Sequence, residues 1–167
     1  MLNIYVNTWG NYNEHGADGG EWLTLPMDAD ELADALARIA ERMGDEDPEW
    51  AIHDYEWAED FRVEISEMAN IAELNELTQQ LADLSAYDLA KLEAMIDAFG
   101  YDIADGLDHL DEYTLYEGMT LNDVAEELVN DCYDLPEFAL RYFDYDAFAR
   151  DLSFDGYTET DYGVIAG

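Results

Sequence analysis

Carboxylates are interspersed among apolar residues along the whole chain, and this pattern constrains its fold more than any other feature. The 167 residues hold 42 Asp and Glu against 6 Lys and Arg, which gives a formal net charge of −36 at pH 7. Hydrophobic residues nevertheless make up 49% of the chain, and aromatic residues 13%. A disordered acidic segment lacks such aromatic content, so the sequence predicts a folded protein whose acids coat the surface.

The charge is spread evenly rather than gathered in a tail. Residues 1–62, 63–103 and 104–167 carry net charges of −13, −8 and −15. Duplex DNA carries one negative charge per about 1.7 Å, so 36 charges correspond to about 60 Å of duplex. A compact globule of this length has a radius of gyration of only about 15 Å. An elongated shape would relieve the repulsion, and we expect one.

The composition excludes several classes of protein. A phosphate backbone would be repelled, so we expect no direct nucleic-acid binding, and a basic surface is the natural partner. No stretch approaches the ~20 apolar residues of a membrane span, and no secretory signal is expected. The single cysteine, Cys132, allows no intrachain disulfide and falls on an apolar helix stripe, where we expect it to be buried and inert. The cytoplasm is the expected location.

Apolar periodicity predicts an α+β fold of three small domains, with small antiparallel sheets and a helical middle domain. In the first domain, residues 1–62, strands are expected at 2–8, 21–25 and 50–57, a loop at 10–20 and a helix from about 28 to 43. In the middle domain, residues 63–103, Asn70 and Ser85 begin helices and Gly100 ends the second. The third domain, residues 104–167, should hold helices after Thr120 and over 137–151, followed by short strands.

No catalytic or cofactor motif is present. With so many carboxylates, chance Asp/Glu pairs carry no information, and neither a zinc signature nor a phosphate loop occurs. His53 lies within a strand pattern and is expected to be structural. Residues 11–16 resemble half of a calcium loop, but Trp22 stands where the terminal Glu should be. The sequence therefore predicts no enzyme, no metal site and no cofactor. The aromatic residues of the first domain should mostly fill its core.

Each predicted helix pairs an apolar stripe with a polar face that has almost no bases. Ordinary helices mix Lys with Glu, because like charges one turn apart destabilise a helix. The acids we expect to meet a basic partner are Glu31, Asp34, Glu41, Glu73, Glu76, Asp83, Asp123, Glu126, Glu127, Asp131, Asp144, Asp146 and Asp151. The 136–152 region is unusually aromatic. Phe138, Tyr142, Phe143, Tyr145 and Phe148 offer more apolar surface than one helix can turn inward, which predicts that some of this surface meets a partner chain.

Four segments in order carry a family resemblance: Ile4-Tyr5-Val6 followed by Gly20-x-Trp22, then Ala51-Ile52-His53-Asp54-Tyr55-Glu56, then residues 70–77, and finally residues 142–152. Together they resemble the ArdA family of antirestriction proteins. The resemblance implies a non-enzymatic mimic of bent B-form DNA that occupies the DNA groove of type I restriction–modification enzymes and blocks restriction and modification. It also implies three domains in an elongated chain, a homodimer through the C-terminal domain near the antirestriction motif at 142–152, and a mobile-element origin.

Two other interpretations share the electrostatics. The acids could hold water and cations in a salt-adapted housekeeping protein, or they could serve an acidic chaperone for a basic partner. Halophilic adaptation does not explain the four family segments, so DNA mimicry is preferred.

Overall fold

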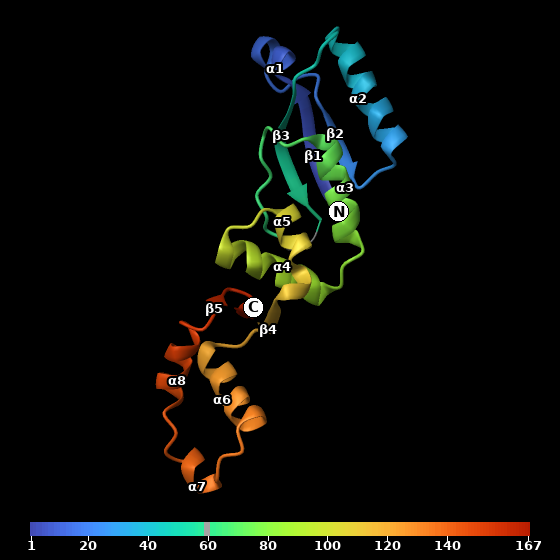
Figure 1. The fold of residues 1–167 in the computed structure, drawn as a ribbon. Helices are drawn as coiled ribbons and strands as arrows, with labels where there is room; N and C mark the ends of the chain where they lie inside the picture. Colours follow the sequence, from blue (N-terminus) through green and yellow to red (C-terminus); the bar gives the residue numbers. More distant parts are fainter. Residues whose placement is uncertain (59–60) are drawn as a thin grey trace. The chain divides into compact units, whose positions relative to one another are not determined.

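The computed structural model describes residues 1–58 and 61–167. It divides into two compact units, residues 1–84 and residues 85–167. Each unit holds one three-stranded antiparallel sheet and several helices (Figure 1), so the predicted α+β class is confirmed. The boundary falls inside the predicted middle segment, between its two helices. The division into three domains in an elongated chain stays a prediction.

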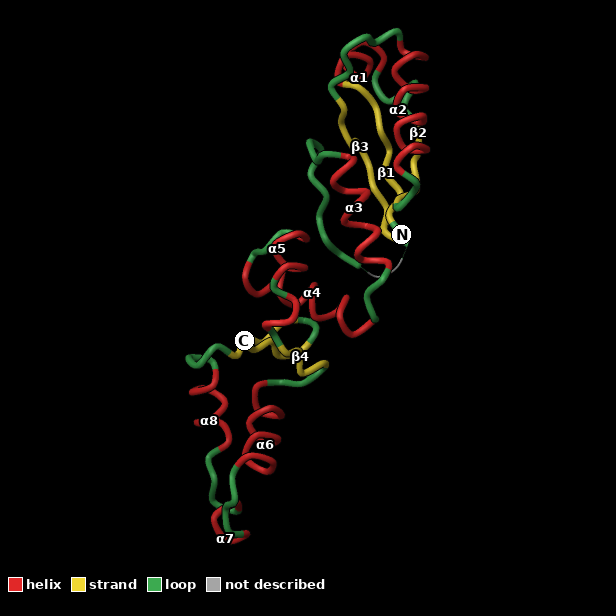
Figure 2. The backbone as a smooth tube through the Cα atoms, turned by 45° about the vertical axis from the view of Figure 1, so that its right-hand side comes forward, coloured by secondary structure: helices red, strands yellow, loops and turns green. Residues whose placement is uncertain are grey.

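The first unit is built on a sheet with strand order β2-β1-β3. Its elements in chain order are β1 (Leu2–Thr8), α1 (Trp9–His15), β2 (Glu21–Leu25), α2 (Ala29–Met43), β3 (Trp50–Trp57) and α3 (Ile71–Ala82). Leu2, Ile4 and Val6 alternate along β1 and point to one face of the sheet. The buried sides of α2 and α3 join the same core cluster, so both helices cover this one face (Figure 2).

The helices of the first unit begin and end where capping chemistry places them. The Asn70 side chain accepts from the backbone N–H groups of Ala72 and Glu73, which starts α3 as predicted. Gly44 ends α2 in the left-handed conformation at φ 67°, which a residue without a Cβ adopts at little cost. The predicted loop at 10–20 is wrong in its first half. The Thr8 hydroxyl accepts from Asn11 N at 3.2 Å and starts the short helix α1.

The second unit holds a sheet with strand order β4-β6-β5. Its elements are α4 (Ala86–Phe99), α5 (Ile103–Asp108), the 3₁₀ turn η1 (Leu110–Glu112), β4 (Thr114–Glu117), α6 (Leu121–Cys132), α7 (Glu137–Leu140), α8 (Tyr145–Leu152), β5 (Tyr157–Thr160) and β6 (Gly163–Ala166). Val164 and Ile165 are adjacent in β6 and both fully buried, so both faces of this strand are covered. Val164 joins the core of α6 and α8.

Hydrogen bonds attach α4 to the sheet of the second unit. The Tyr87 hydroxyl donates to Leu115 O at 2.9 Å and accepts from Leu115 N at 3.1 Å, which ties the first turn of α4 to β4. The caps at Ser85, Gly100 and Thr120 are all confirmed. These bonds place α4 in the second unit, although its sequence continues the helical pattern of α3.

Two predictions in the second unit are wrong. The single helix expected over 137–151 is two helices, because the Asp144 side chain accepts from Ala147 N at 3.0 Å and starts a new one at Tyr145. Cys132 is exposed rather than buried. It continues the stripe of Val124, Ala125 and Val129, but residues 130–134 are all exposed, so the stripe is covered only as far as Val129.

Candidate partner-binding surface

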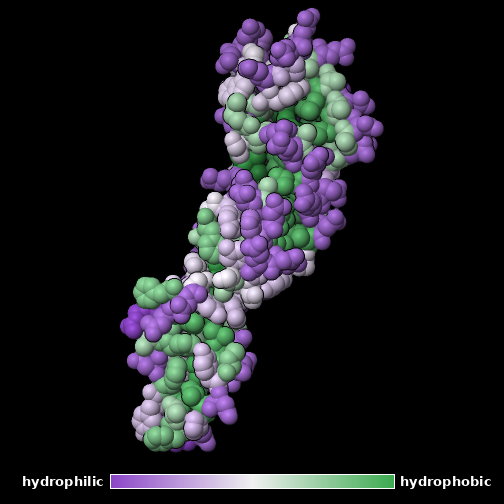
Figure 3. All heavy atoms as spheres, in the orientation of Figure 1, coloured by the Kyte–Doolittle hydropathy of each residue, from purple (hydrophilic) through white to green (hydrophobic). Residues whose placement is uncertain are grey.

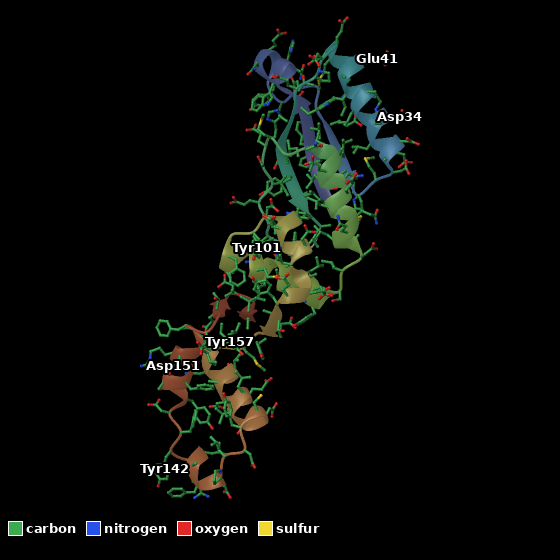
Figure 4. All side chains as sticks on the ribbon, in the orientation of Figure 1. Asp34, Glu41, Tyr101, Tyr142, Asp151 and Tyr157 are labelled. Atoms are coloured by element: carbon green, nitrogen blue, oxygen red, sulfur yellow. The ribbon has the colours of Figure 1, made fainter. Side chains whose placement is uncertain are left out.

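The carboxylates proposed to meet a partner lie on the outside of their helices. Of the thirteen, all are exposed except Glu127, which is half-buried. Those of the first unit lie on α2 and α3 or, for Asp83, directly after α3. Asp34 and Glu41 are seven residues apart, about two turns along α2 (Figure 4). The amphipathic pattern brings this about, since each helix buries its apolar stripe in the core and turns its acids outward.

The acids of the second unit lie on α6 and α8 or, for Asp144, directly before α8, and several of them also fix local structure. Asp123 forms a capping box with Thr120, and these hydrogen bonds, that from the Thr120 side chain first, lower the pKa of the Asp123 carboxyl. Asp144 caps α8, and Asp146 Oδ1 accepts from Asn122 Nδ2 at 2.9 Å. Glu126 and Asp131 are exposed on α6. In the second unit, some carboxylates therefore stabilise local structure through hydrogen bonds, and for others the described contacts show no such role.

The few bases are engaged by acids of the same chain. At least five of the six Lys and Arg side chains lie within 3.8 Å of a carboxylate oxygen. These pairs are Arg38–Glu21, Arg42–Glu21, Lys91–Asp88, Arg141–Glu137 and Arg150–Asp151. Among the thirteen candidate acids, the described ion pairs involve Asp151 alone, at 3.8 Å. The candidate carboxylates are thus left to face solvent with little internal neutralisation.

Glu21 lies within ion-pair distance of two arginines of α2, and the sequence did not single it out. Its Oε1 lies 2.6 Å from Arg38 Nη2, and its Oε2 lies 3.1 Å from Arg42 Nη1. The Arg38 hydrogen bond is the main reason that the pKa of the Glu21 carboxyl is lowered. Arg38 and Arg42 are one turn apart on α2, and this spacing was the available signal for a shared carboxylate partner.

The predicted interface residues near 136–152 divide into two groups. Tyr142 and Phe138 are 78% and 74% exposed, and their rings pack together at 5.3 Å. Phe143, Tyr145 and Phe148 are half-buried, and Phe148 packs against the core of α6 and α8. Hydrophobic side chains are visible on the surface at the end of this unit that holds α7 (Figure 3). Among the five predicted interface residues, the exposed apolar area therefore lies on α7 and directly after it.

His53 and residues 11–16, the segment similar to half of a calcium loop, have structural roles. The His53 ring stacks on Tyr12 at 4.0 Å and meets the edge of Trp9 at 5.3 Å, and its Nδ1 lies 3.0 Å from Glu67 Oε1. Its Nε2 is buried without a hydrogen-bond partner. Tyr12 belongs to α1, so residues 11–16 do not form an open loop. Within residues 1–58 and 61–167, no group of three or more His, Cys, Asp or Glu side chains is arranged to hold a metal ion.

Comparison with known families identifies the family of this acidic protein. A family model described as Antirestriction protein (ArdA) matches residues 4–166, almost the whole chain. The chain belongs to the ArdA family. ArdA is a family of antirestriction proteins. No individual curated protein matches this ArdA chain. None of its described helices has the length and apolar character that crossing a membrane requires.

Proposed function

We propose that this chain inhibits type I restriction–modification enzymes by presenting carboxylates where DNA presents phosphates. The observation that carries the proposal is the surplus of exposed acids on both units. Twelve of the thirteen candidate carboxylates are exposed, while at least five of the six bases are paired within the chain. A protein groove that binds duplex DNA is basic. It therefore attracts an acidic surface, which can displace the bound DNA.

The target surface is the DNA groove of the methyltransferase core, and the form mimicked is bent B-form DNA. Occupying that groove would block restriction and modification together, because both reactions require the enzyme to hold DNA. The family resemblance motivates this assignment, and the even distribution of charge along the chain supports it. Since the inhibitor acts on an enzyme that cuts entering DNA, its place of action is the cytoplasm.

The proposed inhibitor is a homodimer joined through the 136–152 region. Exposed aromatic side chains at Tyr142 and Phe138 supply apolar area of the kind that associating surfaces bury. Arg141 and Arg150 already pair with Glu137 and Asp151 of their own chain, so they add little positive charge to the contact. Two copies would double the length of surface that competes with DNA.

Displacement of DNA from a purified type I methyltransferase core tests the proposal. We expect the protein and a labelled duplex carrying the recognition site to exclude each other. The affinity for the protein should fall as salt rises, because the basic groove regains counterions. A complex that holds the duplex and the protein at once would contradict mimicry.

Matched controls separate mimicry from the two other interpretations. A salt-adapted protein would not displace the duplex at physiological salt. An acidic chaperone would bind an unrelated basic protein, such as a histone, as tightly as it binds the methyltransferase. DNA mimicry predicts preference for the methyltransferase core over such a protein.

A further inference from the structure

The sheet of the first unit has one covered edge and one open edge. At β3, the returning chain supplies partners: Ile52 N donates to Glu67 O at 2.9 Å, and Trp57 Nε1 donates to Val63 O at 2.9 Å. At the other edge, β2 pairs with β1 and with no other strand in the part of the chain that is described. An unpaired strand edge presents free backbone donors and acceptors.

A groove of about 510 Å³ runs along this open edge. On one side it is lined by four consecutive residues of β2, Glu21 to Thr24. Successive residues of a strand point to opposite faces, so a groove lined by four in a row follows the edge of the strand. On the other side it is lined by α2 residues spaced as one helical face: Glu31, Asp34, Ala35 and Arg38.

The chemistry of the groove combines apolar and acidic groups. Trp22 is 49% exposed although it lies in a strand, and its ring packs on Tyr5 at 5.4 Å. Half-buried Met27 adds apolar surface to the lining. Glu31 and Asp34 are exposed and belong to no described ion pair, whereas the charge of Arg38 is met by Glu21. The groove therefore favours a positively charged occupant with apolar side chains between its charges.

We propose that this groove binds an extended basic segment of a partner protein by strand addition to β2. The segment would hydrogen-bond the free edge of β2, place small apolar side chains against Trp22 on the sheet face away from α2, and direct Lys or Arg toward Glu31 and Asp34 on α2. Strand addition beside a helix gives affinity through the backbone and specificity through alternate side chains. The five residues of β2 span about 17 Å, which sets the length of the docked segment. The inference requires neither DNA mimicry nor a restriction enzyme.

A capped eight-residue peptide of alternating Lys and Val provides the probe, with the full-length protein as receptor. At saturating peptide, we expect slower amide hydrogen exchange in β2 and a shift of Trp22 fluorescence, assigned with the Trp22→Phe variant. A peptide of the same sequence, N-methylated at alternate residues so that it keeps its charge but loses N–H donors, should bind at least about tenfold more weakly. Equal binding of the two peptides would overturn the proposal, because charge alone would explain it.

Two charge-matched variants locate the site. The double variant Glu31→Gln/Asp34→Asn removes the two groove acids and should weaken the unmethylated peptide several-fold. Asp30→Asn/Glu46→Gln makes the same change in charge at exposed positions outside the groove and should leave binding within about twofold. Equal weakening by both variants would contradict the site. If the acids only prevent other chains from pairing with the edge of β2, neither peptide will slow amide exchange in β2, and the proposal fails.

Discussion

The side-chain amide of Asn75 hydrogen-bonds both backbone groups of Met27. Its Oδ1 accepts from Met27 N at 2.9 Å, and its Nδ2 donates to Met27 O at 2.9 Å. Asn75 is only 8% exposed, and Leu74 beside it is in the core. The pair joins α3 to the connection between β2 and α2, so a helix expected to begin a separate domain is attached to the first sheet by both polar and apolar contacts.

Replacing Asn75 should destabilise the first unit specifically. Asn75→Ala leaves Met27 N and O without their partner, which should lower the free energy of unfolding by about 1–3 kcal/mol. All four tryptophans, Trp9, Trp22, Trp50 and Trp57, belong to residues 1–84. Their fluorescence during urea denaturation therefore follows this unit alone. Gln79→Ala, at an exposed position of the same helix, is the control. Equal midpoints for the two variants would show that the Asn75 bonds contribute nothing.

No single carboxylate should decide inhibition. Exposed ion pairs are worth about 0–1 kcal/mol each, so Glu126→Gln or Asp146→Asn should change the inhibitory concentration by at most about fivefold. The combined variant Glu126→Gln/Glu127→Gln/Asp131→Asn should weaken inhibition much more. It keeps Asp123, whose cap holds the start of α6. Circular dichroism verifies the fold. A single substitution that abolished inhibition in a folded protein would point to a hot spot rather than to distributed charge.

Assembly should depend on the aromatic residues around α7. Tyr142→Lys places an unpaired charge in the proposed contact and should raise the dimer dissociation constant at least about tenfold. Phe154→Lys is the control, because Phe154 is equally exposed, at 80%, but lies outside residues 136–152. Sedimentation should also show a tighter dimer in moderate salt, since salt screens the repulsion between two acidic chains. A wild-type chain that remains monomeric at micromolar concentration in moderate salt would remove the dimer from the proposed function.

The contribution of His109 to stability should fall as the pH rises. Its Nδ1 lies 2.7 Å from Asp105 O, and this hydrogen bond is the main cause of a raised pKa, with Glu112, Asp108 and Asp105 adding to it. A group with a raised pKa in the folded state stabilises fully below its ordinary value of 6.5 and loses that effect as pH rises through the higher value.

An NMR titration of the histidine ring protons should therefore give His109 a pKa above 6.5. The His109→Gln variant assigns the signal. The same variant should also reduce the pH dependence of amide exchange in α5 above pH 6.5. A pKa at or below 6.5 would show that the Asp105 bond does not hold the imidazolium.

The ends of most elements could be predicted from the sequence because local chemistry sets them. Asn70, Ser85 and Thr120 begin helices with their own side chains, and Gly44 and Gly100 end helices where φ is positive. Alternation along β1 identified the buried face of the first sheet. The two helix errors also have local causes: the hydroxyl of Thr8 starts α1, and the carboxylate of Asp144 starts α8.

The sequence by itself determined that this chain is an acid-coated α+β protein, because periodicity, caps and charge are properties of neighbouring residues. Its ordered motifs, and not these properties, place it in the ArdA family. Only the tertiary structure decided which sheet each helix covers. Asn75 hydrogen-bonds a residue 48 positions away in the sequence, and Tyr87 hydrogen-bonds one 28 positions away. No local sequence pattern predicts either contact. The tertiary structure also decided that Cys132 is exposed and that β2 keeps an open edge beside α2. Exposure depends on which distant elements pack nearby, and a periodic stripe specifies a face without specifying what covers it.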